Sequence, residues 1–421
     1  MNYLLLPDLA AMAMLLGILY FLRRRHPGET VDFWLVALVF IFLEAIIHAA
    51  YPKPGPWRLA AHVAALNFFY VAGAIFLWAS GRDLFPRRTS LRYLLINSVP
   101  VVGLLTTYGL AVHNPRICEG IAGCGLAIGI VSAFVVAGSH PLGRGWWVIA
   151  VQCCMWPPVW YFASTGSFRE SAYFVLFVVY FATAVLFELG LPRKSLGKFA
   201  IVAGFVVWSL VFLSHSWAAN HTGYDAIADE VWNLQKFLVT IGMLLVLLEQ
   251  QVAANEWNAL HDHLTGLPNH RLFEKSLATA VEKSRGGKTR AALLMVDLNG
   301  FKLINDLHGH HIGDELLRHL SQNLRGAIRT GDVLARLGGD EFMILATDLP
   351  ADQPGSALAA ASVDRISAAL CKPVNINGRA FTVTGSIGVA ICPDDATDGV
   401  QLRNLADQRM YEQKRQIPLD F

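Results

Sequence analysis

Two glycines followed by two carboxylates, Gly338 to Glu341, are the residues of this chain best suited to phosphate chemistry. The flanking segments 333–337 and 342–346 are predicted strands, so the glycines lie at a hairpin tip, where positive φ angles and close backbone approach are needed. Asp340 and Glu341 then lie where a polyphosphate and its Mg²⁺ could reach them. A plain hairpin with two solvated acids is the alternative that these residues alone leave open.

A further carboxylate is needed, because Mg²⁺ in nucleotide sites is usually held by one or two carboxylates together with phosphate oxygens. Asp297 can supply it, since it ends the apolar run of strand length that begins at Ala291. The chain then turns at Gly300 and opens a helix. An acid at the end of a buried strand, beside a helix N-terminus, is a usual place for metal and phosphate to gather.

With several other motifs in the same order, these segments resemble the GGDEF family of diguanylate cyclases over roughly residues 262–414. The other motifs are Asp262-His-Leu-Thr-Gly-Leu-Pro-Asn269, Gly309-His-His-Ile-Gly-Asp314, Ser386-Ile-Gly-Val-Ala390, and Ala406-Asp407 with Tyr411 and Lys414 on a last helix. The resemblance implies an α/β domain over residues 262–421. Its central sheet would be mainly antiparallel and flanked by helices, like the nucleotidyl-cyclase and polymerase-palm folds.

The resemblance also implies roles for single residues. The metal ligands would be Asp297, the backbone of Leu298, Asp340 and Glu341, holding two Mg²⁺ (or Mn²⁺) ions per active site. Glu341 would help to activate the attacking 3′-hydroxyl, with Asp340 and Lys302 as the other catalytic residues. The substrate-binding residues would be Asn305, His310, Asp314, Gly338, Gly339 and Lys414.

The implied reaction joins two GTP molecules into cyclic di-GMP by in-line attack of a 3′-oxygen on an α-phosphorus. Catalysis of this kind depends mostly on positioning and electrostatic stabilisation. A carboxylate at Asp314 would accept from guanine N1–H and N2–H₂ and would leave adenine poorly paired, so it favours GTP over ATP. Because each domain has one site and the two molecules must be joined twice, the active species is expected to be a homodimer.

An Arg-x-x-Asp motif, Arg329 to Asp332, precedes the hairpin at the offset typical of the family's product-inhibition site. Its guanidinium and carboxylate would bind cyclic di-GMP, with Arg336 as a secondary contact. An ion pair within a turn is the alternative reading of these residues.

The first 250 residues have the composition of a membrane protein. They hold 16 of the 34 Lys and Arg residues, whereas the shorter remainder holds 18. Apolar stretches near the ~20-residue length needed to span a bilayer occur near 4–22, 31–51, 59–80, 93–113, 121–139, 146–163, 172–190, 199–217 and 231–249. Residues 1–249 are therefore predicted to form a sensory or scaffold domain of about nine spans in a lipid bilayer.

Loop charges predict the orientation, because Lys and Arg accumulate on the cytoplasmic side. With the N-terminus outside, inner loops hold Arg23, Arg24, Arg25, Arg82, Arg87, Arg88, Arg92, Arg144, Arg193, Lys194 and Lys198. Outer loops hold Lys53, Arg58, Arg116 and Arg169. An odd number of spans then places the C-terminal domain in the cytoplasm, below a bacterial inner membrane. The net charge of +2 gives no indication of a nucleic-acid surface.

Ionisable groups inside the predicted spans are costly and often functional. Glu44 and His48 share one helix face and could bind a ligand, proton, metal or haem together with His62, or could form ordinary interhelical hydrogen bonds. Two others of this kind are Glu188 and His215. The stimulus of the membrane domain is not predicted.

Residues 244–261 are predicted to be one helix leaving the membrane, of which 250–261 form a signalling linker. Leu245, Val252 and Ala259 recur every seven residues and could form a short parallel dimer seam. On the outer side, Cys118 and Cys124 flank the mouth of spans four and five, and they could pair or remain thiols.

The predicted function is a membrane-bound diguanylate cyclase. The first alternative is a non-catalytic cyclic di-GMP or GTP receptor that signals through the membrane domain. The second is a transporter fused to a regulatory domain, which the sparse polar groups of the spans do not favour. The intact carboxylates Asp297, Asp340 and Glu341 favour the enzyme over a receptor.

Overall fold

The computed structural model describes residues 6–25, 28–50, 56–81, 87–138, 145–192, 195–219, 225–286 and 289–416. Contacts within the chain divide it into two compact units, Met1–Gln250 and Gln251–Phe421. We call these the helical unit and the sheet unit. The boundary between them lies next to the change in composition near residue 250.

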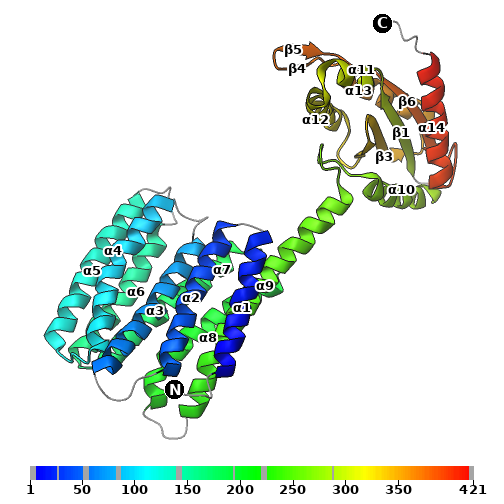
Figure 1. Cartoon of the computed structure of the whole chain (residues 1–421). Coiled ribbons are helices and arrows are strands. Elements are labelled where there is room, and N and C mark those ends of the chain that lie inside the picture. Colours follow the sequence, from blue (N-terminus) through cyan, green and yellow to red (C-terminus); the bar gives the residue numbers. More distant parts are fainter. Residues whose placement is uncertain are drawn as a thin grey trace. The chain divides into compact units, whose positions relative to one another are not determined.

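The helical unit contains nine helices in its described residues (Figure 1). They are α1 (Leu6–Arg25), α2 (Glu29–Ala50), α3 (Pro56–Gly81), α4 (Arg87–Gly109), α5 (Pro115–Gly138), α6 (Gly145–Ser164), α7 (Phe168–Gly190), α8 (Leu196–Ala219) and α9 (Asp225–Leu260). Each overlaps one predicted apolar stretch. Eight are long and apolar enough to cross a membrane. The exception is α6, which contains Pro157 and Pro158. The side chains of its first residues lie outside the described part of the chain.

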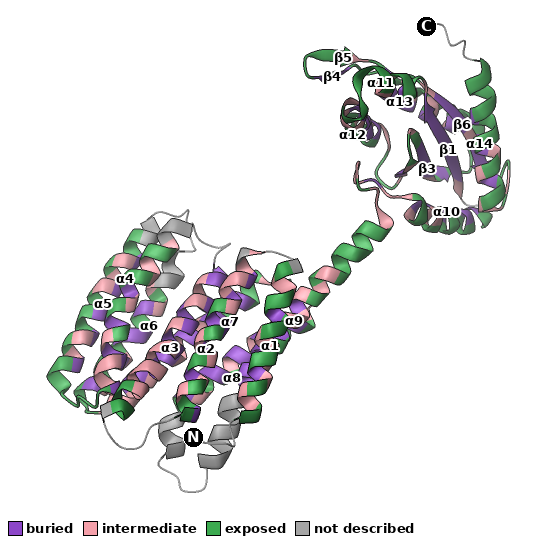
Figure 2. Ribbon diagram, viewed as in Figure 1, coloured by how far each residue is buried: buried purple, intermediate pink, exposed green. Residues whose placement is uncertain are grey.

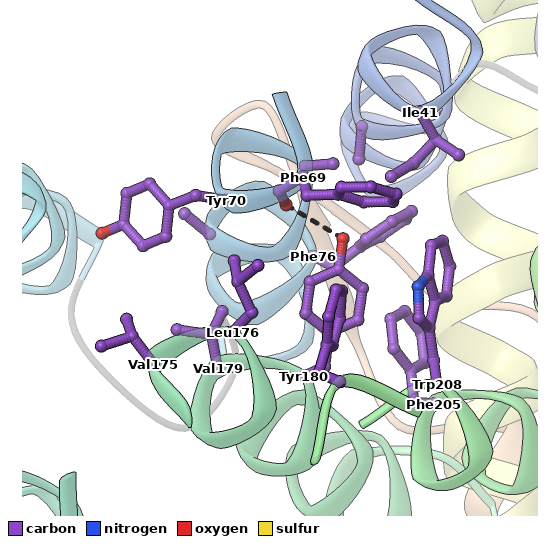
Figure 3. Packing of buried hydrophobic residues seen from close by; sticks show 14 of the residues in the cluster. Ile41, Phe69, Tyr70, Phe76, Val175, Leu176, Val179, Tyr180, Phe205 and Trp208 are labelled. Carbon is purple, nitrogen blue, oxygen red and sulfur yellow. Dashed lines mark hydrogen bonds between the residues drawn. The ribbon is translucent and has the colours of Figure 1, made fainter. Parts of the chain in front are cut away.

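Aromatic side chains and glycines set the packing of the helical unit. Tyr180 is fully buried between aromatic rings, and its hydroxyl donates to the backbone oxygen of Phe69 at 2.9 Å (Figure 3). Small residues let α8 and α9 approach closely. A Cβ atom at Gly204 would lie 2.6 Å from Val239, and one at Gly242 would lie 2.7 Å from the Ile201 nitrogen. The helix that leads to the sheet unit is thus packed tightly against its neighbour.

One predicted polar group of the spans takes part in a buried ion pair. Glu44 of α2 lies 3.3 Å from Nζ of Lys236 in α9, and the two side chains are only 3% and 7% exposed. The Lys236 ammonium also lies 5.7 Å from the ring centre of Phe69. Glu44 is therefore paired with a cation from another helix.

The other predicted polar groups have separate surroundings. The His62 ring packs edge-on against Tyr108, with ring centres 5.5 Å apart. Glu188 lies 2.9 Å from Nζ of Lys198. The side chain of His215 lies outside the described residues. No group of three His, Cys, Asp or Glu side chains that could hold a metal occurs in the described part of the chain.

The two cysteines predicted to flank an outer mouth are not paired. Cys118 and Cys124 are both free thiols, and both belong to α5, which begins earlier than the predicted span. Residues six apart on a helix point to different sides, since successive residues are about 100° apart. The disulfide considered from the sequence is therefore ruled out by the helix that contains both residues.

The sheet unit is built on a four-stranded antiparallel sheet with the order β2-β3-β1-β6. Its strands are β1 (Thr289–Leu298), β2 (Val333–Gly338), β3 (Glu341–Pro350) and β6 (Gly385–Cys392), with β4 (Val374–Ile376) and β5 (Arg379–Phe381) as a separate hairpin. The helices are α10 (His270–Arg285), α11 (Phe301–His308), α12 (His310–Ala327), α13 (Gly355–Leu370) and α14 (Gly399–Gln416). The predicted antiparallel sheet flanked by helices is confirmed.

The alternation of side chains along β1 produces two cores, and Figure 2 shows this strand buried between helices. Even-numbered residues from Ala292 to Leu298 belong to the core that contains residues of α12 and α13. Odd-numbered residues from Ala291 to Met295 belong to the core that contains residues of α10 and α14. Asp297 continues the odd-numbered row, so its carboxylate leaves the sheet on the side of α14.

A glycine in β6 sets the distance between α14 and the sheet. A Cβ atom at Gly388 would lie 1.9 Å from the backbone oxygen of Ala406 and 2.3 Å from the Met410 nitrogen. No side chain fits between the two backbones, so α14 lies directly on β6. This close approach brings the last turn of α14 within reach of the end of β1.

The predicted helix over residues 244–261 is part of α9, which runs without interruption from Asp225 to Leu260. The ninth apolar stretch and the linker are therefore one helix. Along the seam, Val252 is exposed, and the parallel dimer contact remains a prediction.

Candidate active site

The catalytic hairpin is joined to the end of β1 by strand register. Asp297 lies opposite Glu341 across the β1–β3 ladder. The backbone nitrogen of Leu298 donates to the backbone oxygen of Asp340 at 3.3 Å. The tip needs glycine, because Gly338 and Gly339 have φ angles of +148° and +54°. These contacts bring three predicted carboxylates, from two segments of the sequence, to one corner of the sheet.

The electrostatics of this corner are those of a site with too much negative charge. Burial raises the pKa of the Asp340 carboxyl above its ordinary value, and the charge of Asp297 adds to the effect. The pKa of the Glu341 carboxyl is raised in the same way, by burial first and then by the charges of Asp297 and Asp340. A cation placed here would relieve this repulsion.

One protein cation is already present at the site. Nζ of Lys414, from the last turn of α14, lies 2.6 Å from Oδ1 of Asp297. The Asp297 side chain is 8% exposed and the Lys414 side chain 44%. The ammonium is therefore at the edge of the site, where it can leave the carboxylate without crossing the core.

The donor set fits Mg²⁺ or Mn²⁺ held jointly with a substrate. Such ions prefer oxygen ligands, and in nucleotide sites Mg²⁺ takes only one or two carboxylates from the protein. Asp297 and Asp340 offer this number, and the backbone oxygen of Leu298 adjoins them. No group of three ligand side chains that could hold a metal occurs among the described residues, so phosphate oxygens would have to complete the shell.

Two of the predicted substrate-binding residues lie on neighbouring helices. Asn305 is in α11 and Asp314 is in α12, both half-buried. The Oδ1 atom of Asn305 is buried and has no hydrogen-bond partner. A Cβ atom at Gly313 would lie 1.9 Å from that oxygen. Glycine at position 313 leaves room for the Asn305 oxygen, which still needs a hydrogen-bond donor.

Two other residues implied by the family resemblance are exposed in this structure. Lys302 lies in the first turn of α11, and His310 is the first residue of α12. Neither forms a hydrogen bond or an ion pair with the carboxylates in the described part of the chain. The catalytic role of Lys302 and the substrate-binding role of His310 remain predictions.

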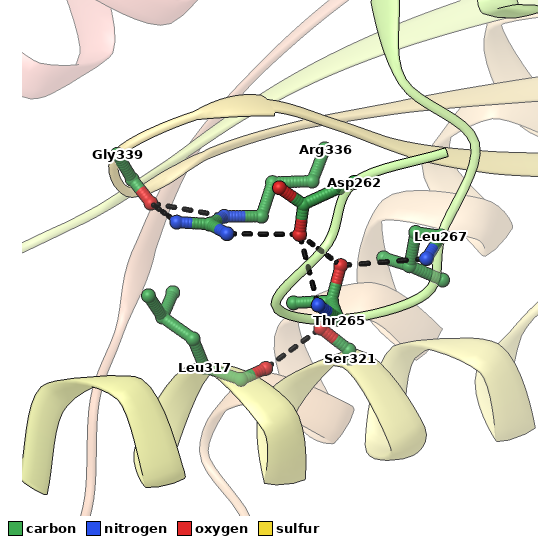
Figure 4. A network of polar contacts seen from close by, with 7 residues as sticks. All are labelled: Asp262, Thr265, Leu267, Leu317, Ser321, Arg336 and Gly339. Atoms are coloured by element: carbon green, nitrogen blue, oxygen red, sulfur yellow. Dashed lines mark hydrogen bonds and ion pairs between the residues drawn. The ribbon is translucent and has the colours of Figure 1, made fainter. Parts of the chain in front are cut away.

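Arg336, the predicted secondary contact for the product, is held by partners within the domain. It is 8% exposed, and its guanidinium donates twice to the backbone oxygen of Gly339, at 3.1 and 2.8 Å (Figure 4). Its Nη1 donates to Oδ1 of Asp262 at 2.9 Å. Asp262 also accepts from the backbone nitrogen and hydroxyl of Thr265. Arg336 thus connects the entrance of the domain to the tip of the hairpin.

The environment of Asp262 keeps it charged. Burial alone would raise the pKa of its carboxyl, but hydrogen bonds from Thr265 and Arg336 and the charge of Arg336 outweigh burial and hold the pKa below its ordinary value. Sequence reasoning found both residues and missed their contact. The only signal was the motif itself, since the partners are 74 residues apart.

The product-site motif does not form an ion pair. The Asp332 carboxylate accepts from the backbone nitrogens of Arg329, at 2.9 Å, and of Thr347, at 3.2 Å. In the described part of the chain the exposed Arg329 guanidinium has no acidic partner. The ion pair considered as the alternative from the sequence is therefore absent here, and the guanidinium is available to a ligand.

Sequence reasoning also missed a charge on α14. Asp407 is one of the groups whose charge raises the pKa of the Glu341 carboxyl. In the sequence, Asp407 stands out only as part of a motif on the last helix. Its spacing of seven residues from Lys414 puts both on the same side of α14.

Comparison with known proteins identifies the family of this region. Residues 259–417 match the family described as "Diguanylate cyclase, GGDEF domain". MucR of Pseudomonas aeruginosa, named as a bifunctional diguanylate cyclase/cyclic di-GMP phosphodiesterase, is 41% identical over 160 residues, which are 38% of this chain and 22% of MucR. The predicted GGDEF domain is thus confirmed for the sheet unit.

A second relative, for which a domain structure has been solved, is also similar in sequence. The diguanylate cyclase TpbB of Pseudomonas aeruginosa is 35% identical over 170 residues, which are 40% of this chain and 38% of TpbB. A solved structure of the TpbB GGDEF domain alone is 37% identical, with 37% of this chain and 90% of that chain covered and a TM-score of 0.36. The chain spans only about a fifth of MucR and two fifths of TpbB.

Proposed function

We propose that this chain is a membrane-bound diguanylate cyclase that condenses two GTP molecules into cyclic di-GMP and releases two pyrophosphates. The main observation that supports this proposal is the grouping of Asp297, Asp340 and Glu341 at the end of β1. The pKa values of the Asp340 and Glu341 carboxyls are raised there. Within a GGDEF domain, this is the arrangement expected of a catalyst. A receptor would need the nucleotide contacts but not three crowded carboxylates.

Each condensation forms a bond between a 3′-oxygen and an α-phosphorus, and breaks the bond from that phosphorus to the pyrophosphate oxygen. Glu341 lies at the exposed end of β3, where it can orient the 3′-hydroxyl and accept its proton. Its raised pKa suits that task, because a general base works best with a pKa near the working pH. Asn305 and Asp314 hold the guanine, and Lys414 moves from Asp297 to the phosphates.

The metal ligands in this proposal are Asp297, Asp340, Glu341 and the backbone oxygen of Leu298. When bound, two divalent ions would neutralise charge on the phosphate oxygens and on the departing pyrophosphate. Since one unit contributes one GTP, a homodimer is required to form both bonds. Helix α9 ends only two residues before Asp262, so contacts along it could set how two such domains face each other.

The helical unit is proposed to lie in the bacterial inner membrane. Eight of its helices are long and apolar enough to cross a membrane. The distribution of Lys and Arg favours nine spans with the N-terminus outside, with α6 as the further span. The sheet unit would then be in the cytoplasm, where GTP is available. The eight-span alternative would put the sheet unit on the wrong side.

The full chain, purified in detergent or nanodiscs, is expected to convert GTP and Mg²⁺ into cyclic di-GMP and pyrophosphate in a ratio of one to two. Chromatography with mass detection measures the first product and a coupled phosphate assay the second. ATP is the matched control and is expected to give no cyclic product. GTP binding without turnover would instead favour the receptor alternative.

Product inhibition is a second part of the proposal. The free Arg329 guanidinium and the Asp332 carboxylate lie on the turn before β2, outside the carboxylate corner. Arg329→Ala is expected to leave the initial velocity unchanged in product-free reactions and to weaken inhibition by added cyclic di-GMP at least about tenfold, since hydrogen bonds to charged groups contribute ~1.5–3 kcal/mol. Progress curves measure both quantities, and Arg325→Ala, an exposed change on α12, is the control. Identical inhibition of wild type and Arg329→Ala would exclude this site.

A further inference from the structure

Three side chains from three helices meet at one end of the helical unit. Consecutive helices run in opposite directions, so α3 and α7 begin, and α4 ends, at the end where α9 begins (Figure 1). His62 of α3, Tyr108 of α4 and Arg169 of α7 lie there. The Tyr108 ring is 5.5 Å from the His62 ring centre to centre, and its hydroxyl is 3.4 Å from Nε of Arg169. Tyr108 therefore stands between a guanidinium and an imidazole.

A glycine makes this meeting possible. A Cβ atom at Gly109 would lie 2.9 Å from the Cα atom of Val63. The end of α4 thus approaches the backbone of α3 directly, beside both Tyr108 and His62. All three polar side chains are half-buried, so they are partly desolvated and still reachable.

Among the described residues, cations outnumber carboxylates around this cluster. The charged groups that act on the His62 ring are Arg169 and Arg58, both cationic. For Arg169, the one carboxylate that acts is Glu170, and its effect is weaker than that of Tyr108. Within the described part of the chain, neither His62 nor Arg169 has an acidic hydrogen-bond partner. A guanidinium has five N–H donors, and one long bond to Tyr108 uses few of them.

The distribution of arginines makes the cluster more unusual. In the proposed orientation the outer loops hold four basic residues, and two of these four, Arg58 and Arg169, act on a single imidazole. The positive-inside tendency disfavours cations on this side. Their convergence indicates a local requirement for positive charge.

We propose that Arg169, His62 and Tyr108 form a binding site for a small carboxylate with an apolar body. The guanidinium fork matches the two oxygens of one carboxylate, and the phenol and imidazole supply further donors. The apolar body would lie against aromatic rings, since Tyr173 packs 6.3 Å from Tyr108 and also contacts Phe212. The proposal does not depend on the cyclase activity, and its test measures binding alone.

The test uses benzoate as probe and the full chain in phosphatidylcholine nanodiscs, titrated by calorimetry. Wild type is expected to bind benzoate saturably, and Arg169→Gln is expected to bind at least about tenfold more weakly. The matched control is Arg116→Gln. Arg116 is an exposed arginine at the start of α5, at the same end of the unit, and its loss should leave the affinity unchanged. Benzamide, with the same ring and no charge, should not bind.

Several outcomes would overturn the proposal. Absence of saturable benzoate binding to wild type would do so, as would equal affinity of wild type and Arg169→Gln. Equal competition by inorganic phosphate would exclude selectivity for a carboxylate. Loss of benzoate binding in phosphatidylglycerol nanodiscs would assign the cluster to lipid headgroups. Tyr108→Phe, which keeps the ring, should weaken binding modestly, and a folded Tyr108→Phe protein with unchanged affinity would remove the hydroxyl from the site.

Discussion

Glu341→Gln is expected to lower cyclic di-GMP synthesis by about 10²–10⁴-fold, the usual contribution of a positioned general base. The same change should stabilise the metal-free protein. The Glu341 pKa is raised by burial and by the charges of Asp297 and Asp340, so the ionised carboxylate is less favourable in the folded chain than in the unfolded chain. Removing the charge relieves that repulsion. Loss of activity with a gain in stability is the signature of a residue kept for chemistry.

The sign of the pH dependence follows from the raised pKa. Between the unfolded and the folded pKa the folded state binds more protons, so the stability of the metal-free wild type falls as pH rises through this window. Glu341→Gln removes the Glu341 contribution to this dependence, whereas the contribution from the raised pKa of Asp340 remains. The thermal midpoint of the variant should therefore exceed that of wild type at neutral pH, by about 2–4 °C per kcal/mol relieved, and the difference should vanish at acidic pH.

Thermal unfolding with and without Mg²⁺, from pH 4 to 8, measures this effect. Saturating Mg²⁺ should stabilise wild type more than the variant. Glu282→Gln is the matched control, because its carboxylate is exposed on α10 and pairs only with Arg285 in the described structure. A variant as active as wild type, or one less stable than wild type at neutral pH without metal, would remove Glu341 from the proposed site.

The hairpin and the helices could be predicted because their causes are local. The paired glycines Gly338 and Gly339 predict the hairpin tip, where both residues have positive φ angles. Long apolar stretches predict the nine helices of the helical unit. The alternation of side chains along β1 is also a local property, and it places the Asp297 carboxylate on the side of α14. What the sequence could not show was which helix covers that side. The contact of Asp297 with Lys414 depends on Gly388, whose missing side chain lets α14 rest on β6.

The role of Arg336 was not predictable for a related reason. The residue stands two positions before the hairpin glycines, and the family resemblance implied a secondary contact with the product. Its actual partners are the Gly339 oxygen and Asp262, which precedes it by 74 residues. A buried guanidinium must satisfy its donors, and the turn at Asp262 supplies the carboxylate. Only the fold brings that turn beside the hairpin.

Glu44 shows the same limit in the helical unit. Its spacing from His48 suggested a ligand site, but the ion pair partner is Lys236, 192 residues later. Nothing in the sequence connects Lys236, which lies in the ninth apolar stretch, with Glu44. The two charges compensate each other, which explains how α9 can carry a lysine in an otherwise apolar segment.

Lys236→Met is expected to destabilise the full chain by about 3–5 kcal/mol, because it leaves the buried Glu44 carboxylate without its cation. Glu44→Met should have a similar cost, since it leaves the ammonium of Lys236 unpaired. The double variant Glu44→Met with Lys236→Met should recover most of the loss. Replacing both members of a buried pair by apolar residues of similar volume is often neutral or stabilising by ~1–4 kcal/mol.

Thermal and denaturant unfolding of the four proteins in one detergent would give the coupling between the two residues as a double-mutant cycle. The matched control is Arg23→Met. Arg23 pairs with Asp32 between α1 and α2, but these side chains are 41% and 39% exposed. An exposed pair contributes only about 0–1 kcal/mol, so this change should cost little. If the losses of stability in the double variant were additive, each side chain would act through its own packing. The ion pair would then not be the interaction that holds Lys236 of α9 against α2.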